Sequence, residues 1–122
     1  MKTIKLRFFA AAVLTMCVVN ISSAGDCKIA EEILSKAVSI KPDAMTEKNI
    51  KTAIAQCPDK PSLYDRAGNY YAHWYENETD AGLKAGYKKL AVEYYQQGTE
   101  YATGNTAEQM ILKTARLEGK RE

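Results

Sequence analysis

The chain has 122 residues, of which 17 are Lys or Arg, 15 are Asp or Glu and three are Cys, with a formal net charge of +2. This length allows one domain, and a composition with 46% hydrophobic and 26% charged residues is ordinary for a globular protein. A large multidomain enzyme, a protein with many membrane spans and a wholly disordered chain are therefore excluded.

Residues 1–24 have the layout of a secretory signal peptide. Three basic residues and no acidic residue come first, and an apolar run follows over residues 8–19. Small residues stand at Ser22 and Ala24, the third-last and last positions before a cut, so we expect cleavage after Ala24. The apolar run is shorter than the roughly 20 residues that span a bilayer.

Two other interpretations of this segment are an uncleaved membrane anchor and a lipid-attachment signal that uses Cys17. Asn20 disfavours the anchor because it interrupts the apolar stretch, and the bulky Met16 disfavours lipid attachment. We therefore expect export, to the periplasm in preference to secretion or lipid anchoring.

Cleavage leaves residues 25–122 as a single domain. This domain has 14 basic and 15 acidic residues, a net charge of −1, because the three basic residues of the signal are removed. A nearly neutral domain without a basic run predicts no nucleic-acid binding. It also contains no apolar stretch that would span a membrane.

The mature chain begins with two segments of helical periodicity. Residues 28–40 and 46–56 both place apolar side chains on one face, and Pro42 separates the two segments. Asp26 and Thr46 are the expected N-caps of the two helices. The two segments together predict an antiparallel helical hairpin.

Cys27 and Cys57 predict a disulfide at the open end of this hairpin. Each cysteine lies 15 residues from Pro42, so folding the chain back at the proline brings the sulfur atoms together. A bridge is the usual state of an even pair in an exported protein, and a loop of this size gives roughly 3–4 kcal/mol of stabilisation. The chain has no C-x-x-C motif, which favours a structural over a redox-active bridge.

Three further helices follow the proline-rich turn at 57–61. Two long ones are expected at 62–78 and 81–101, and a last one begins where Thr106 and Gln109 would form a capping box. No segment shows the alternation of a strand. The fold class expected is all-α, with about five helices in antiparallel order and one disulfide.

Small and large residues recur along these helices at fixed steps. Ala30, Leu34, Ala37 and Pro42 follow one another at steps of four, three and five residues. Thr46, Ile50, Ala53 and Pro58 repeat the same steps, so each series ends at a proline. Residues 58–71 form a proline turn followed by an aromatic and an Ala-Gly pair, and steps of four and three resume at Ala91. The residues expected to pack between helices are Ala30, Leu34, Ala37, Ile50, Ala53, Tyr64, Ala67, Gly68, Tyr71, Ala91, Tyr95 and Gly98.

This pattern resembles the tetratricopeptide repeat over residues 27–102. The resemblance implies a short α-α superhelix of antiparallel hairpins. Twenty residues separate Tyr71 from Ala91, more than the family spacing, and Thr103 stands where the family has proline. A generic disulfide-stapled helical bundle is the alternative. Because fewer than three full repeats bury little core, self-association into a homo-oligomer or docking onto a larger assembly would add buried surface.

Nine aromatic residues, all eight tyrosines and Trp74, fall between positions 64 and 101. One interpretation is core packing between the two long helices, with the tyrosine hydroxyls at the rim. The other is that several of them line a groove, since aromatic surfaces with polar ends suit recognition.

A polar stripe crosses the helix expected at 62–78, with Asp65, Asn69, His73 and Asn77 each four residues apart. The resemblance places the ligand-facing side of a first repeat helix here. Asn69 matches an asparagine of repeats that grip a peptide carboxylate, but Asp65 stands where those repeats have lysine, which favours a neutral or basic peptide. A solvated helix face is the alternative. The candidate partner-binding residues are Ser62, Asp65, Asn69, Ala72, His73 and Glu76.

The residues do not assemble a catalytic or metal site. His73 is the one histidine, so neither a Ser-His-Asp triad nor a multi-histidine metal site is expected. Asp65 lies two helical turns from His73, about 12 Å along the axis, too far to share a metal. We expect no enzyme activity and no cofactor.

The function expected from these features is that of an exported, non-catalytic interaction module. It would act as an adaptor or assembly factor that binds a protein or peptide partner. One alternative is a small inhibitor or immunity-type protein that blocks a basic hydrolase. A second is a structural subunit of an envelope complex.

Overall fold

The structure, a computed structural model, describes residues 26–119. The predicted signal peptide at 1–24 and Cys17 lie outside the described residues. Five helices and no strand form the described part of the chain, which confirms the all-α prediction. Their bounds are α2 Cys27–Ala37, α3 Ala44–Gln56, α4 Pro61–Asn77, α5 Ala81–Tyr101 and α6 Gly104–Leu117.

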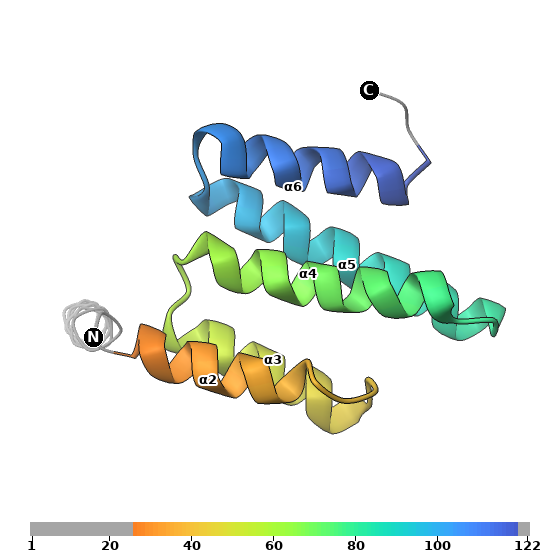
Figure 1. Ribbon diagram of the computed structural model, residues 1–122, viewed down its shortest axis with the longest axis horizontal. Coiled ribbons are helices and arrows are strands. Elements are labelled where there is room, and N and C mark those ends of the chain that lie inside the picture. The colour runs from red at the N-terminus through yellow and green to blue at the C-terminus, as the bar shows by residue number, and fades with distance from the viewer. Residues whose placement is uncertain (1–25, 120–122) are drawn as a thin grey trace, which may run out of the picture.

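The helices form two antiparallel hairpins and a final helix (Figure 1). Helices α2 and α3 make the short hairpin, α4 and α5 make the long one, and α6 packs on α5. The contact between α4 and α5 is the most extensive, whereas α4 touches α2, α3 and α6 much less. None of the helices in the part of the chain that the structure describes is both long and apolar enough to cross a bilayer.

The ends of the short hairpin differ from the prediction. Helix α2 ends at Ala37, not at residue 40, and Ile40 beyond it is 55% exposed. Asp26 is the N-cap residue of α2, as predicted, but its side chain makes no capping hydrogen bond. The N-cap of α3 is Asp43, whose Oδ1 accepts from the backbone N–H of Thr46 at 2.8 Å. Thr46 therefore lies in the first turn of the helix, because Asp43 occupies the N-cap position three residues earlier.

Helix α6 begins earlier than predicted. Its first residue, Gly104, has φ = +56°, a backbone conformation that glycine adopts without steric cost. The N-cap is Thr103, with no side-chain capping bond, and Thr106 lies within the first turn. The predicted capping box of Thr106 and Gln109 is therefore wrong, since the turn made by the glycine decides where the helix starts.

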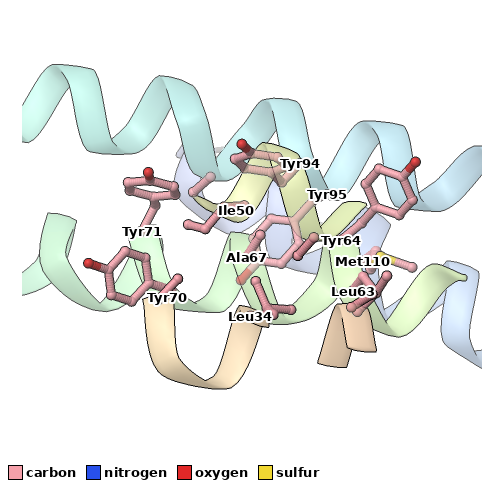
Figure 2. Close-up of a cluster of buried hydrophobic side chains, with 14 of the residues drawn as sticks. Leu34, Ile50, Leu63, Tyr64, Ala67, Tyr70, Tyr71, Tyr94, Tyr95 and Met110 are labelled. Carbon is pink, nitrogen blue, oxygen red and sulfur yellow. The ribbon is translucent and has the colours of Figure 1, made fainter. Parts of the chain in front are cut away.

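The core lies between the hairpins and is rich in tyrosine (Figure 2). All twelve residues of the small-and-large pattern are buried. Close approach of α4 and α5 requires glycine at two places. A Cβ atom on Gly68 would lie 2.5 Å from the Tyr95 ring, and one on Gly98 would lie 2.6 Å from the Cβ of Tyr64.

Most of the aromatic residues belong to this core. The buried members are Tyr64, Tyr70, Tyr71, Tyr87, Tyr94 and Tyr95. The Tyr71 ring is at the centre, stacked on the Tyr94 ring at 5.9 Å and 3° and on the Tyr87 ring at 6.3 Å and 29°. Trp74 is half-buried and Tyr101 is 46% exposed. Core packing therefore accounts for six of the nine, and Trp74 is discussed below.

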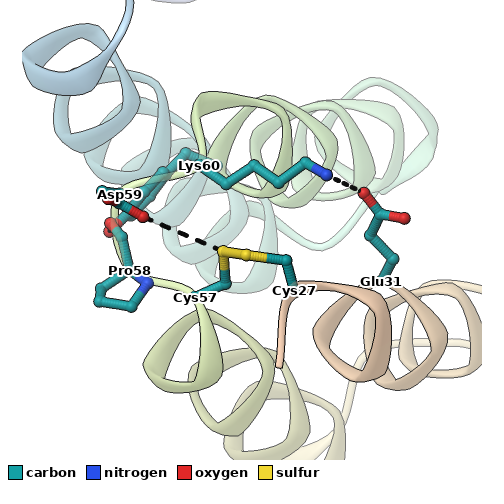
Figure 3. The surroundings of a disulfide bond; sticks show 7 residues. Cys27, Glu31, Cys57, Pro58, Asp59 and Lys60 are labelled. Atoms are coloured by element: carbon teal, nitrogen blue, oxygen red, sulfur yellow. Dashed lines mark hydrogen bonds and ion pairs between the residues drawn. A yellow bond between two sulfur atoms is a disulfide. The ribbon is translucent and has the colours of Figure 1, made fainter. Parts of the chain in front are cut away.

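The sulfur atoms of Cys27 and Cys57 form a disulfide at the open end of the α2–α3 hairpin, as the spacing predicts (Figure 3). Their Cα atoms are 5.0 Å apart. Beside the bridge, Lys60 from the turn before α4 pairs with Glu31 of α2. The hydrogen bond and charge of Lys60 lower the pKa of the Glu31 carboxyl. The start of α4 is thus tied to the stapled end of the short hairpin.

Candidate functional site

Helix α4 carries the predicted partner-binding residues along one side. Asn69, His73 and Glu76 are exposed, whereas Asp65 and Ala72 are half-buried. Ser62 is exposed too, but it lines neither of the two hollows described below.

The first hollow, called here the α2 hollow, separates α4 from the chain that leaves α2. It has a volume of about 440 Å³, and it combines apolar and aromatic side chains with a guanidinium and an imidazole. Its lining residues are Val38, Ser39, Ile40, Arg66, Asn69, Tyr70, His73 and Trp74. Trp74 and Tyr70 are the aromatic residues that line this hollow, and the Trp74 ring lies edge-on to that of His73 at 6.0 Å.

The second hollow, called here the α6 hollow, lies between α4 and α6 and has a volume of about 280 Å³. Its lining residues are Asn69, Ala72, His73, Tyr75, Glu76, Tyr95, Lys113, Arg116 and Leu117. Asn69 and His73 belong to both hollows, so the two adjoin along α4. The α4 surface is defined here as these two hollows together with Asp65.

A polar network fixes the centre of the α4 surface. Lys113 Nζ lies 2.9 Å from Asp65 Oδ1 and 3.2 Å from Asn69 Oδ1, and the Tyr95 hydroxyl donates to the same amide oxygen at 2.6 Å. Because an ammonium can only donate, the amide oxygen of Asn69 must face Lys113. The Asn69 NH2 group therefore points elsewhere, and it has no partner among the described residues.

Burial and the neighbouring carboxylates keep the Tyr95 phenol protonated. The pKa of Tyr95 is raised by burial first and by the charges of Asp65 and Glu76 next, so the phenol stays a hydrogen-bond donor near neutral pH. A protonated phenol and a charged ammonium both point at the Asn69 oxygen. The amide is consequently held in a single orientation.

Lys113 and Arg116 of α6 were missed by the sequence reasoning. Lys113 is 48 residues from Asp65, and no local pattern connects the two positions. Lys113 forms an ion pair with Asp65, so the Asp65 carboxylate is not an unpaired charge on this surface. With Arg66, Lys113 and Arg116 against Asp65 and Glu76, the α4 surface carries one net positive charge.

No group of three or more His, Cys, Asp or Glu side chains within residues 26–119 is placed to hold a metal ion. His73 packs against Trp74 and has no carboxylate hydrogen-bonded to its ring among these residues. The two hollows of the α4 surface combine hydrogen-bond donors with apolar walls.

Comparisons of the chain with protein families, with curated proteins and with solved structures found no match. The tetratricopeptide resemblance therefore stays a prediction from the spacing of residues. Function must be argued from the geometry of the α4 surface.

Proposed function

We propose that the protein is an exported, non-catalytic interaction module that binds a protein or peptide partner on the α4 surface. The observation that carries the proposal is the Asn69 amide. Its oxygen is held by Lys113 and Tyr95, and its NH2 group is left to donate where the α2 and α6 hollows adjoin.

An extended peptide would use these groups in different ways. The Asn69 NH2 group would donate to a main-chain carbonyl, a contact that does not depend on the peptide's sequence. An apolar side chain would enter the α2 hollow against Ile40 and Trp74, where aromatic and aliphatic walls suit a buried anchor. Arg66 and Arg116 favour a neutral or acidic peptide at the two hollows, since neither is paired with a carboxylate among the described residues.

Export supports a role in the cell envelope. The signal-like segment at 1–24 and the Cys27–Cys57 bridge both suit an oxidising compartment outside the cytoplasm. A stapled domain of this size, with a contact surface on one helix, suits an adaptor or assembly factor that holds another envelope protein.

Site-specific photocrosslinking tests this proposal. A photoreactive phenylalanine analogue at position 73 should crosslink to a partner in the intact envelope, because His73 lines both hollows. The matched control is position 89 on α5, which is exposed but lines neither hollow. Adding Asn69→Ala should abolish the crosslink from position 73.

Equal crosslinking from positions 73 and 89, or none from either, would contradict a partner on the α4 surface. Capture of one hydrolase whose activity is lost in the complex would instead favour the inhibitor interpretation. The two results are separated by identifying the crosslinked protein and measuring its activity.

A further inference from the structure

The α2–α3 bend, defined here as residues 38–43, and the first turn of α3 expose two large apolar side chains. Ile40 is 55% exposed and Met45 is 59% exposed, and the two are only five residues apart. The bend lies at the end of the short hairpin opposite the disulfide (Figure 1). The other exposed large hydrophobic residues lie singly, at Ile29 on α2, Leu83 and Tyr101 at opposite ends of α5, and Ile111 on α6.

The backbone carbonyls at this bend are paired inside the protein. Three of them accept hydrogen bonds from side-chain hydroxyls. The carbonyls are those of Lys36, Ile40 and Lys41, and the donors are Ser39, Tyr70 and Thr46 in the same order. Pro42 in the middle of the bend has no backbone N–H. Because the carbonyls of an ordinary loop depend on water, a bend that is paired in this way loses less when water leaves it.

Lysines surround the two apolar side chains. The exposed lysines that form no ion pair with a described residue are Lys36, Lys41 and Lys48. Residues 36–51 contain four lysines and two acidic residues, a net charge of +2, whereas residues 25–122 as a whole have a net charge of −1. Of the two acidic residues, Asp43 caps α3 and Glu47 is paired with Lys51. The positive charge of the domain is therefore concentrated around the exposed apolar pair.

We propose that the α2–α3 bend docks on the surface of an anionic lipid bilayer. Ile40 and Met45 would enter the boundary between headgroups and acyl chains, and the surrounding lysines would contact the lipid phosphates. Exposed apolar side chains among basic residues are typical of proteins that lie on a membrane without crossing it. Met45 lines neither hollow of the α4 surface, and a fluid bilayer accepts a projecting side chain without a matching cavity. The docking would hold the α4 surface close to a membrane of the envelope.

Cosedimentation with lipid vesicles tests this proposal. The disulfide-bonded protein, purified after export, is mixed with vesicles of phosphatidylcholine and phosphatidylglycerol in equal amounts. The control is vesicles of phosphatidylcholine alone. Binding to the anionic vesicles should be stronger by more than about tenfold, since each lysine near an anionic surface contributes about fivefold. The difference should shrink as the salt concentration rises, because salt screens the attraction between the lysines and the phosphates.

Single substitutions identify the bend as the docking site. Met45→Ser and Lys41→Gln should each weaken binding to the anionic vesicles by about fivefold, since each removes one contact with the bilayer. The matched control is Ile111→Ser, which removes a side chain that is 53% exposed on α6 and should bind as the parent does. Any contribution of the N-terminal segment is common to the parent and the variants, so it does not affect these ratios.

Equal binding to the two kinds of vesicle, or equal losses in Met45→Ser and Ile111→Ser, would overturn the proposal. Absence of binding to both kinds would also overturn it, and would favour an acidic protein as the partner of the bend. All three substituted residues are exposed, so the variants should unfold at the same urea concentration as the parent. Met45 and Lys41 do not line the α4 surface, so crosslinking from position 73 should be unchanged and the proposed function can fail separately.

Discussion

Replacing Gly68 with alanine tests how closely α4 and α5 must approach. A Cβ atom at this position would lie 2.5, 2.6 and 2.9 Å from three atoms of the Tyr95 ring. Tyr95 is 2% exposed and its hydroxyl donates to Asn69, so displacing the ring would strain this hydrogen bond and the packing around it. Overpacking of this kind costs about 1–3 kcal/mol.

The helix propensity of alanine acts in the opposite direction. Exchanging glycine for alanine inside a helix stabilises it by about 1 kcal/mol. Gly86 of α5 is the matched control, since a Cβ atom there meets nothing within 4 Å. Gly86→Ala should therefore gain about 1 kcal/mol, whereas Gly68→Ala should range from no change to a loss of about 2 kcal/mol.

Thermal and urea unfolding of the two variants measure this difference. The packing cost at Gly68 is the difference in the free energy of unfolding between Gly68→Ala and Gly86→Ala, expected at about 1–3 kcal/mol. For a domain of this size, each kcal/mol changes Tm by roughly 4–8 °C. A displaced Tyr95 ring should also move the side-chain NH2 resonances of Asn69. If both alanine variants were stabilised alike, the close approach of α4 to Tyr95 would be refuted.

Three other predictions concern the disulfide, the tyrosine hydroxyls and stability at acid pH. Reduction of the disulfide should lower the free energy of unfolding by roughly 3–4 kcal/mol in urea titrations, and an unchanged midpoint would contradict a formed bridge. Tyr94→Phe should cost no stability, because the lost hydroxyl is unpaired among the described residues. Tyr70→Phe should cost about 1 kcal/mol, because it loses the hydrogen bond to the Ile40 carbonyl. Equal losses in the two variants would contradict this difference between the two hydroxyls. Lys60 lowers the pKa of Glu31 in the folded state, so this pair stabilises the fold above the ordinary carboxyl pKa of 4.5. This contribution to the free energy of unfolding is lost as the pH falls through the lowered, folded-state pKa of Glu31. The free energy of unfolding should therefore depend less on pH in Glu31→Gln, and an unchanged pH dependence in that variant would contradict the Lys60–Glu31 pair.

Local periodicity predicted the helices well because each is amphipathic over several turns. The bounds of α5 agree with the sequence, and α4 differs by one residue at each end. Helix α2 ends three residues earlier than predicted, and two other exceptions lie where a single side chain or glycine decides the boundary. Asp43 moves the start of α3, and the left-handed Gly104 moves the start of α6.

The candidate site was predicted only in part, for a different reason. The stripe on α4 follows from spacing within one helix, and the structure brings Asn69 and His73 to the meeting of two hollows. Lys113 could not be placed beside Asp65 from the sequence, because that contact depends on how α6 crosses α4. The charge of a surface built from several helices is a tertiary property, and a pattern within one helix does not reveal it.

The bond from the Tyr70 hydroxyl to the Ile40 carbonyl has a mechanical consequence. It connects α4 to the bend between α2 and α3, and both residues line the α2 hollow. At the other end of the short hairpin, Lys60 and Glu31 tie the same two units together. The short hairpin is thus held against α4 at both ends, and Arg66 of α4 adds a bond to Ser35 of α2 between them. Loss of the Tyr70 bond, worth about 1 kcal/mol, would therefore free the end of the short hairpin that borders the α2 hollow.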